Sequence, residues 1–283
     1  MTREASIIEL GHWLQSPPGQ HIVQWEQHQL DLAVADAFGF HALQLGLPQI
    51  DALRANRMPH RWVASDSMAL PQPMCLPPVD EGLATLSPHD VLALHCDFDA
   101  LPFPSQSIDL VVLPHALELA RDPHETLREV ERVLVPEGQV VITGFNPASL
   151  WALRHQAGRL RQRMGLGGEV FMPSASGLIG HWRLRDWLKL LSCEVEISRF
   201  GCWRPPLNRQ RWLDSWGWMD RAGERWWPVL GAVYFVVAVK RVRGMRLVGL
   251  ARRQLGTGKA AAASVVSQRQ NAQPASSTGP EPQ

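Results

Sequence analysis

The stretch from Val91 to Gly144 constrains the fold more than any other part of this chain. VLALHC and IDLVVL are short, nearly unbroken apolar runs, which are typical of parallel strands that helices cover on both faces. Asp122-Pro123 marks the start of a helix after the second run, and Pro136-Glu137-Gly138 ends it before a third apolar run, QVVIT. This order predicts the second half of a doubly wound α/β domain, in which ligands bind at the carboxyl ends of the strands.

The flanking sequence extends the same pattern in both directions. Residues 1–40 indicate an N-terminal helical cap, in which Val23, Leu30, Val34 and Phe38 share a helical face before Gly39. We expect further strands and helices in the order strand FHALQLG, helix Ile50 to Asn56, strand His60 to Ser65, helix Arg183 to Leu191, and strands Cys193 to Phe200 and Tyr234 to Val242. The last two strands are expected to pair antiparallel.

The composition divides the chain into three parts. Residues 41–245 form the main domain and include an insert at residues 201–230 that is rich in Trp and Arg. Residues 255–283 are dominated by Ala, Ser, Gln and Pro with few apolar anchors, so we expect a disordered tail.

A specific motif carries a family resemblance. CDFDALPFPSQSIDLVVLPHALE, followed by DPHETLREVERVLVPEG, resembles the core of the class I S-adenosylmethionine (SAM)-dependent methyltransferases, in particular the type 11 methyltransferase domain. The resemblance covers residues 38–200 and implies a Rossmann-like, seven-stranded mixed sheet with one reversed edge strand, and SAM as cofactor. It also implies that Asp97 approaches the adenine amino group and that Phe98 packs on the adenine ring. Asp99 in the same loop is equally well explained as a turn former.

The glycine-rich turn of that family is incomplete here. After the first strand the chain reads Leu43-Gln44-Leu45-Gly46-Leu47-Pro48, so only Gly46 corresponds to the family's three glycines, and Gln44 replaces the usual acidic residue. The LQLG start resembles a proteobacterial subgroup of methyltransferase-like proteins. Three readings stay open: a reshaped SAM site, a site for a modified SAM-like ligand, or a fold that has lost cofactor binding. Asp66, 20 residues after Gly46, is the candidate ribose ligand, although Asp-Ser also starts ordinary turns.

Methyl transfer from a sulfonium depends mostly on positioning, and only some acceptors need a base. The resemblance places Pro114 and the residues after it beside the transferring methyl group. His115 is therefore a candidate base and Glu118, three residues along, a candidate partner that orients it. The alternative is that His115 caps a helix or hydrogen-bonds to a backbone carbonyl.

Balanced charge and the absence of recognised motifs exclude several classes. The 28 basic and 27 acidic side chains give a net charge of +1, so we expect no nucleic-acid partner. The four cysteines have no metal-ligand spacing, so we expect no metal. The N-terminus lacks the pattern of a signal peptide, and no apolar run is long enough to cross a membrane, so a cytoplasmic location is expected.

Eight of the chain's 12 tryptophans lie between Trp182 and Trp227, interleaved with arginines. This combination can stack on planar substrates, bind phosphates or lie in a lipid headgroup layer, although a cap that simply buries its indoles is the commoner case. The sequence therefore predicts a SAM-dependent methyltransferase with a small-molecule, quinone-like or lipid-like acceptor and peripheral membrane contact through the insert. The rival reading is a non-catalytic methyltransferase-like binding module.

Overall fold

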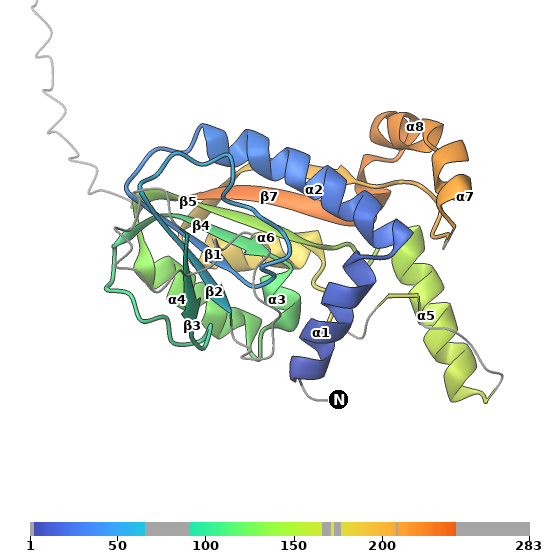
Figure 1. Cartoon of the computed structure of the whole chain (residues 1–283), viewed down its shortest axis with the longest axis horizontal. Coiled ribbons are helices and arrows are strands. Elements are labelled where there is room, and N and C mark those ends of the chain that lie inside the picture. Colours follow the sequence, from blue (N-terminus) through green and yellow to red (C-terminus); the bar gives the residue numbers. More distant parts are fainter. Residues whose placement is uncertain (1–2, 66–90, 166–170, 173–176, 208, 242–283) are drawn as a thin grey trace, which may run out of the picture. The chain divides into compact units, whose positions relative to one another are not determined.

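The computed structural model describes residues 3–65, 91–165, 171–172, 177–207 and 209–241. Among these residues a seven-stranded sheet has the order β3-β2-β1-β4-β5-β7-β6 (Figure 1). The strands are β1 His41–Leu45, β2 His60–Ser65, β3 Val91–His95, β4 Ile108–Pro114, β5 Leu134–Phe145, β6 Cys193–Gly201 and β7 Val233–Lys240. The helices are α1 Arg3–Leu14, α2 Pro17–Ala35, α3 Ala116–Leu119, α4 Pro123–Val133, α5 Leu150–Arg163, α6 His181–Leu190, α7 Gln210–Ser215 and α8 Trp218–Trp226, with a short 3-10 turn, η1, at Pro228–Leu230.

The directions of the strands confirm the predicted class I methyltransferase fold. The pairs β1-β2, β2-β3, β1-β4 and β4-β5 are parallel, whereas β7 runs antiparallel to both β5 and β6. The prediction that the reversed strand lies at the edge was wrong, because β7 lies between β5 and β6, and β6 forms the edge. All eight residues of β7 are buried, and the seven before Lys240 form the unbroken apolar run that an internal strand requires.

Alternate residues of the central strands divide the core into two layers. On one face Leu110 and Val112 of β4 belong to a cluster that includes Ile22, Leu30 and Val34 of α2. On the other face Val111 and Leu113 pack in a cluster with Leu127, Val130 and Val133 of α4. The period of two along the strand and the helical spacing on α2 and α4 therefore bury both faces of the inner sheet.

The N-terminal residues form two helices, and the second ends earlier than the predicted helical spacing, which included Phe38. Helix α2 begins at Pro17, because the Ser16 hydroxyl caps the helix by accepting a hydrogen bond from the Gly19 amide (3.4 Å). It ends at Ala35, so Phe38 lies beyond it and is 90% exposed. Phe38 therefore does not extend the apolar face of the helix.

Two further expectations were wrong for local reasons. No helix forms at residues 50–56, where the chain makes successive turns between β1 and β2. Strand β3 is not covered on both faces, because it forms the other sheet edge, and Leu92 is 41% exposed. The predicted helix after Asp122-Pro123 is confirmed as α4, where the Asp122 carboxylate accepts hydrogen bonds from the amides of His124 (2.8 Å) and Glu125 (3.4 Å).

Candidate functional site

Gln44, near the end of β1, organises the turn that follows the strand. Its side chain is completely buried, and its amide nitrogen donates to the carbonyl oxygens of Leu47 (2.9 Å) and Ile50 (2.7 Å). Its side-chain oxygen accepts a hydrogen bond from the Ala52 amide (3.1 Å). Both amide hydrogens of Gln44 are thus used inside the protein. These hydrogen bonds do not favour Gln44 as a cofactor ligand, and that role stays a prediction.

Gly46 brings the same turn against the end of β4. Its φ of +108° lies in the region that favours glycine, and a Cβ there would lie 3.1 Å from both the Ala116 Cβ and the Pro114 carbonyl oxygen. Leu47 and Ile50, which follow it, are fully buried in the cluster beneath α2. The missing side chain of Gly46 therefore makes room for Ala116 and Pro114 of this protein. In a glycine motif the same space is left open to the ligand, so this turn does not fit that role.

His115 lies at the centre of a buried charged group. It has a left-handed backbone (φ 52°) between β4 and α3, and its amide donates to the Thr143 carbonyl on β5 (3.1 Å). Its Nδ1 lies 3.0 Å from Glu118 Oε2, and its Nε2 forms an ion pair with Glu26 Oε1 on α2 at 2.9 Å. All three side chains are at most 1% exposed.

The surrounding carboxylates favour the charged form of His115. Burial disfavours that form and is the largest single influence, but Glu26 and Glu118 together outweigh it and raise the pKa of His115 to about 10. Burial disfavours the charged form of Glu118 as well, and for a carboxyl group this raises the pKa. Hydrogen bonds from His115 and from the Phe145 amide (2.5 Å) act in the opposite direction. A protonated imidazole has no free lone pair, so this arrangement argues against His115 as a general base near neutral pH.

The loop after β3 has a different character. Asp97 is exposed, and its Oδ1 accepts a hydrogen bond from the Asp99 amide (3.3 Å). Asp99 in turn accepts a hydrogen bond from the Thr126 hydroxyl (2.8 Å), which connects the loop to helix α4. Phe98 is 1% exposed and packs in the core cluster on the α4 face. An exposed carboxylate at the carboxyl end of a strand fits the adenine end of a SAM site.

The predicted site residues thus fall into two groups within the described chain. Gly46, Pro114, His115 and Glu118 meet where β1 and β4 end, whereas Asp97 and Phe98 lie after β3 at the edge of the sheet. Asp66 lies outside the described residues.

The sequence reasoning missed Glu26, the second carboxylate on His115. The available signal was its position on α2, because Ile22, Glu26 and Leu30 follow one another at intervals of four residues, which places an acidic side chain within an apolar face.

The described residues offer neither a metal site nor a membrane-spanning helix. They contain no group of three or more His, Cys, Asp and Glu side chains arranged to hold a metal ion. No helix in the same residues is long and apolar enough to cross a membrane.

Comparisons with known proteins agree with the fold. Residues 79–142 match a family model described as a methyltransferase domain. The chain also aligns with a solved structure of the complex between the Haloferax volcanii Trm112 methyltransferase activator and a methyltransferase, with 19% identity over 83% of this chain and 97% of that chain, at a TM-score of 0.53. Residues 79–142 are thus similar to part of a methyltransferase domain, and the sheet has the strand order of the class I methyltransferase fold.

Curated relatives match only parts of the chain. The uncharacterized protein YafS of Escherichia coli K12 is 37% identical over 142 residues, which cover 50% of this chain and 52% of the relative. A malonyl-[acyl-carrier protein] O-methyltransferase of Halorhodospira halophila is 45% identical over 58 residues, 20% of each chain. A demethylmenaquinone methyltransferase of Chlamydia pneumoniae is 35% identical over 54 residues, 19% of this chain and 24% of the relative. The chain thus spans about half the length of the first relative and a quarter or less of the other two.

Proposed function

We propose that this protein is a SAM-dependent methyltransferase that acts on a small-molecule acceptor of quinone-like or lipid-like character. The observation that carries the proposal is the matched segment 79–142, which includes Asp97, exposed in the loop after β3, and the whole of β4. Asp97 would accept a hydrogen bond from the adenine amino group. SAM would supply an electrophilic methyl group on a sulfonium, whose transfer requires mainly orientation and exclusion of water.

The acceptor class has two supports. Two partial relatives are named for a malonyl-acyl-carrier protein and for demethylmenaquinone. The insert also exposes several indoles, among them Trp218 (55%) and Trp226 (71%). Indoles beside arginines are suited to the headgroup layer of a membrane, where lipid-like acceptors reside. We therefore include peripheral contact with a membrane surface through the insert in the proposal.

A second candidate function is a methyltransferase-like binding module without cofactor. The turn after β1 favours it, because Gln44 fixes that turn and Gly46 packs against Ala116. The buried charges around His115 favour it as well, because they hold the candidate base in its protonated form. In this reading Glu26, His115 and Glu118 only connect α2 to the sheet.

Calorimetric titration with SAM and with S-adenosylhomocysteine decides between the two functions. The first predicts binding with a micromolar dissociation constant, and the second predicts no heat beyond dilution. Replacing Asp97 with Ala should weaken binding by about 1 to 3 kcal/mol, roughly 5- to 150-fold, because the adenine would lose a hydrogen bond to a charged group.

Asp186 provides the matched control for this titration. It is an exposed carboxylate on α6, and within the described chain it has no ion pair. The Asp186→Ala variant should bind SAM as the unmodified protein does. Equal affinities of the Asp97→Ala variant and the unmodified protein would remove Asp97 from the cofactor site.

A further inference from the structure

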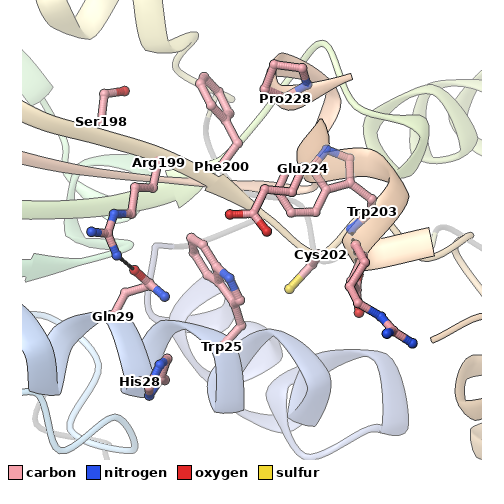
Figure 2. Close-up of a pocket in the computed structure, with 12 residues that line it drawn as sticks. Trp25, His28, Gln29, Ser198, Arg199, Phe200, Cys202, Trp203, Glu224 and Pro228 are labelled. Atoms are coloured by element: carbon pink, nitrogen blue, oxygen red, sulfur yellow. Dashed lines mark hydrogen bonds between the residues drawn. The ribbon is translucent and has the colours of Figure 1, made fainter. Parts of the chain in front are cut away.

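A pocket of about 680 Å³ lies between helix α2, strand β6 and the insert (Figure 2). Trp25 and Gln29 of α2 line one side, Arg199 and Phe200 of β6 the other, and Glu224 of α8 also borders it. The volume is in the range of sites for small organic ligands. Strand β6 is the sheet edge opposite β3, so the pocket is distinct from the Asp97 loop.

The aromatic walls of this pocket are held by close packing against backbone. The ring of Trp25 lies directly on Gly201, where a Cβ would come within 2.1 Å of it. Trp203 is 8% exposed, its ring packs against Gly223, and its indole nitrogen donates to the Trp227 carbonyl (2.9 Å). These contacts fix the indole planes in advance, so a flat ligand can bind against them with little loss of side-chain entropy.

Three charged side chains that line the pocket, Arg199, Arg221 and Glu224, form no ion pair within the described part of the chain. The Arg199 guanidinium donates to the side-chain oxygen of Gln29 (2.8 Å), and within the described chain no carboxylate forms an ion pair with it. The Glu224 carboxylate is directed toward the Trp25 ring in Figure 2, and no described cation pairs with it. Asp220, by contrast, already pairs with Arg204 at 2.7 Å.

This arrangement has a charged donor at one end, a carboxylate further along, and aromatic rings between them. The fork of Arg199 leaves donors that suit a carboxylate, sulfonate or phosphate group. Glu224 suits a hydroxyl or amine hydrogen. We propose that the pocket binds a planar aromatic ligand that carries an anionic group toward Arg199 and a hydrogen-bond donor toward Glu224.

The proposal is tested by calorimetry without SAM, using 6-hydroxy-2-naphthoate and its uncharged analogue 6-hydroxy-2-naphthamide. The naphthoate should bind at least about tenfold more tightly than the amide, because only its charge is matched by Arg199. The Arg199→Gln variant should lose that preference while keeping its fold, since Arg199 lies on the surface. The Glu224→Gln variant should weaken binding of 6-hydroxy-2-naphthoate but leave 2-naphthoate, which lacks the hydroxyl group, unchanged.

Arg57 provides the matched control, because it is exposed in the loop before β2. In the sheet, β2 and β6 lie on opposite sides of the central strands β1, β4 and β5. The Arg57→Gln variant should bind both naphthalene probes as the unmodified protein does. Equal affinity of the unmodified protein for acid and amide, no binding of either, or an unchanged preference in the Arg199→Gln variant would each overturn the proposal. Because SAM is absent, these results do not depend on the proposed methyl transfer.

Discussion

Glu26 connects the N-terminal helix α2 to the carboxyl end of β4 through the imidazole of His115. Both side chains are fully buried, so removing either partner would leave the other without this partner in an environment that excludes water. Glu118 adds a second carboxylate and binds the Phe145 amide at the end of β5. His115 and Glu118 together therefore connect α2, the end of β4 and the end of β5.

The pH dependence of stability should report this proton. The pKa of His115 is raised to about 10 in the folded protein, against about 6.5 in an unfolded chain. The stabilisation is therefore fully present below pH 6.5 and is lost as the pH rises toward 10. Between pH 7 and 8.5 the titration of His115 should lower the free energy of unfolding by up to about 1.4 kcal/mol per pH unit. Urea unfolding at several pH values measures it.

Glu118 does not reverse the sign of this effect. Its pKa is also raised in the folded protein, so its contribution to stability likewise decreases with rising pH. In the Glu26→Gln variant the imidazole loses one of its two carboxylates, so its pKa should fall and the slope between pH 7 and 8.5 should become flatter. A slope that is the same in both proteins would show that His115 is not held charged by Glu26.

Individual residues show what a sequence can and cannot disclose about a site. Asp122 was assigned to a helix start from local sequence alone, because a cap involves atoms only two or three residues away. Glu118 was likewise assigned to His115 from its spacing, but the second carboxylate was not, because Glu26 lies 89 positions earlier in the chain and only the packed fold brings it to His115. The role of His115 therefore could not be derived from the residues around it.

At the scale of elements, the turn between β1 and β2 depends on Gln44. Three backbone groups of the turn, on Leu47, Ile50 and Ala52, are satisfied by this one buried side chain. In a helix these backbone groups would hydrogen-bond to one another. Here the Gln44 side chain supplies their hydrogen-bond partners instead. The predicted helix at residues 50–56 was wrong because a short apolar run does not distinguish a helix from turns that bury the same side chains.

Replacing Gln44 with Ala should destabilise the protein by roughly 3 kcal/mol or more, because buried backbone groups of the turn would lose their partners. The Ala52 amide should also exchange its hydrogen faster, by a larger factor than amides in β4. Chemical denaturation and hydrogen exchange measure the two effects. Gln24 on α2 is exposed, so the Gln24→Ala variant should change neither. Unchanged protection of Ala52 in the Gln44→Ala variant would mean that other contacts fix the turn.

The strands were more predictable than this turn. Strand β2 was predicted with its observed limits, His60–Ser65, and β7 was recognised from its unbroken apolar run. The exposure of β3 was not foreseen, because an apolar run does not disclose whether a strand has one neighbour or two. The position of β7 between β5 and β6 is likewise a property of the whole sheet, which no single strand sequence contains.

At the scale of the whole molecule, the insert at residues 201–230 adds an exposed aromatic surface to the α/β domain. Trp218 and Trp226 are eight residues apart on α8, so they lie on the same face of the helix, and both are exposed. Trp227 (54% exposed) and Leu230 (43% exposed) follow them. A composition of exposed indoles with neighbouring arginines is typical of helices that lie in the interfacial layer of a membrane.

We therefore expect the protein to bind phosphatidylglycerol vesicles more tightly than phosphatidylcholine vesicles, and less tightly at high salt. The lipid charge would attract Arg221 and Arg225, each worth about 1 kcal/mol near an anionic surface. Replacing both Trp218 and Trp226 with Ser should lower the partition coefficient by at least about tenfold, because two indoles would no longer enter the interface. Cosedimentation with vesicles measures the partition coefficient.

A variant at Trp182 tests whether the membrane contact lies on α8 or arises from any exposed indole. Trp182 is 62% exposed on α6, outside the insert, so replacing it with Ser removes an exposed indole of similar accessibility. Partitioning that falls equally in the Trp182→Ser variant and the double variant would indicate nonspecific adsorption through exposed indoles. Partitioning that falls only in the double variant would place the membrane contact on α8, so that a lipid-like acceptor would reach the protein from the side of the insert.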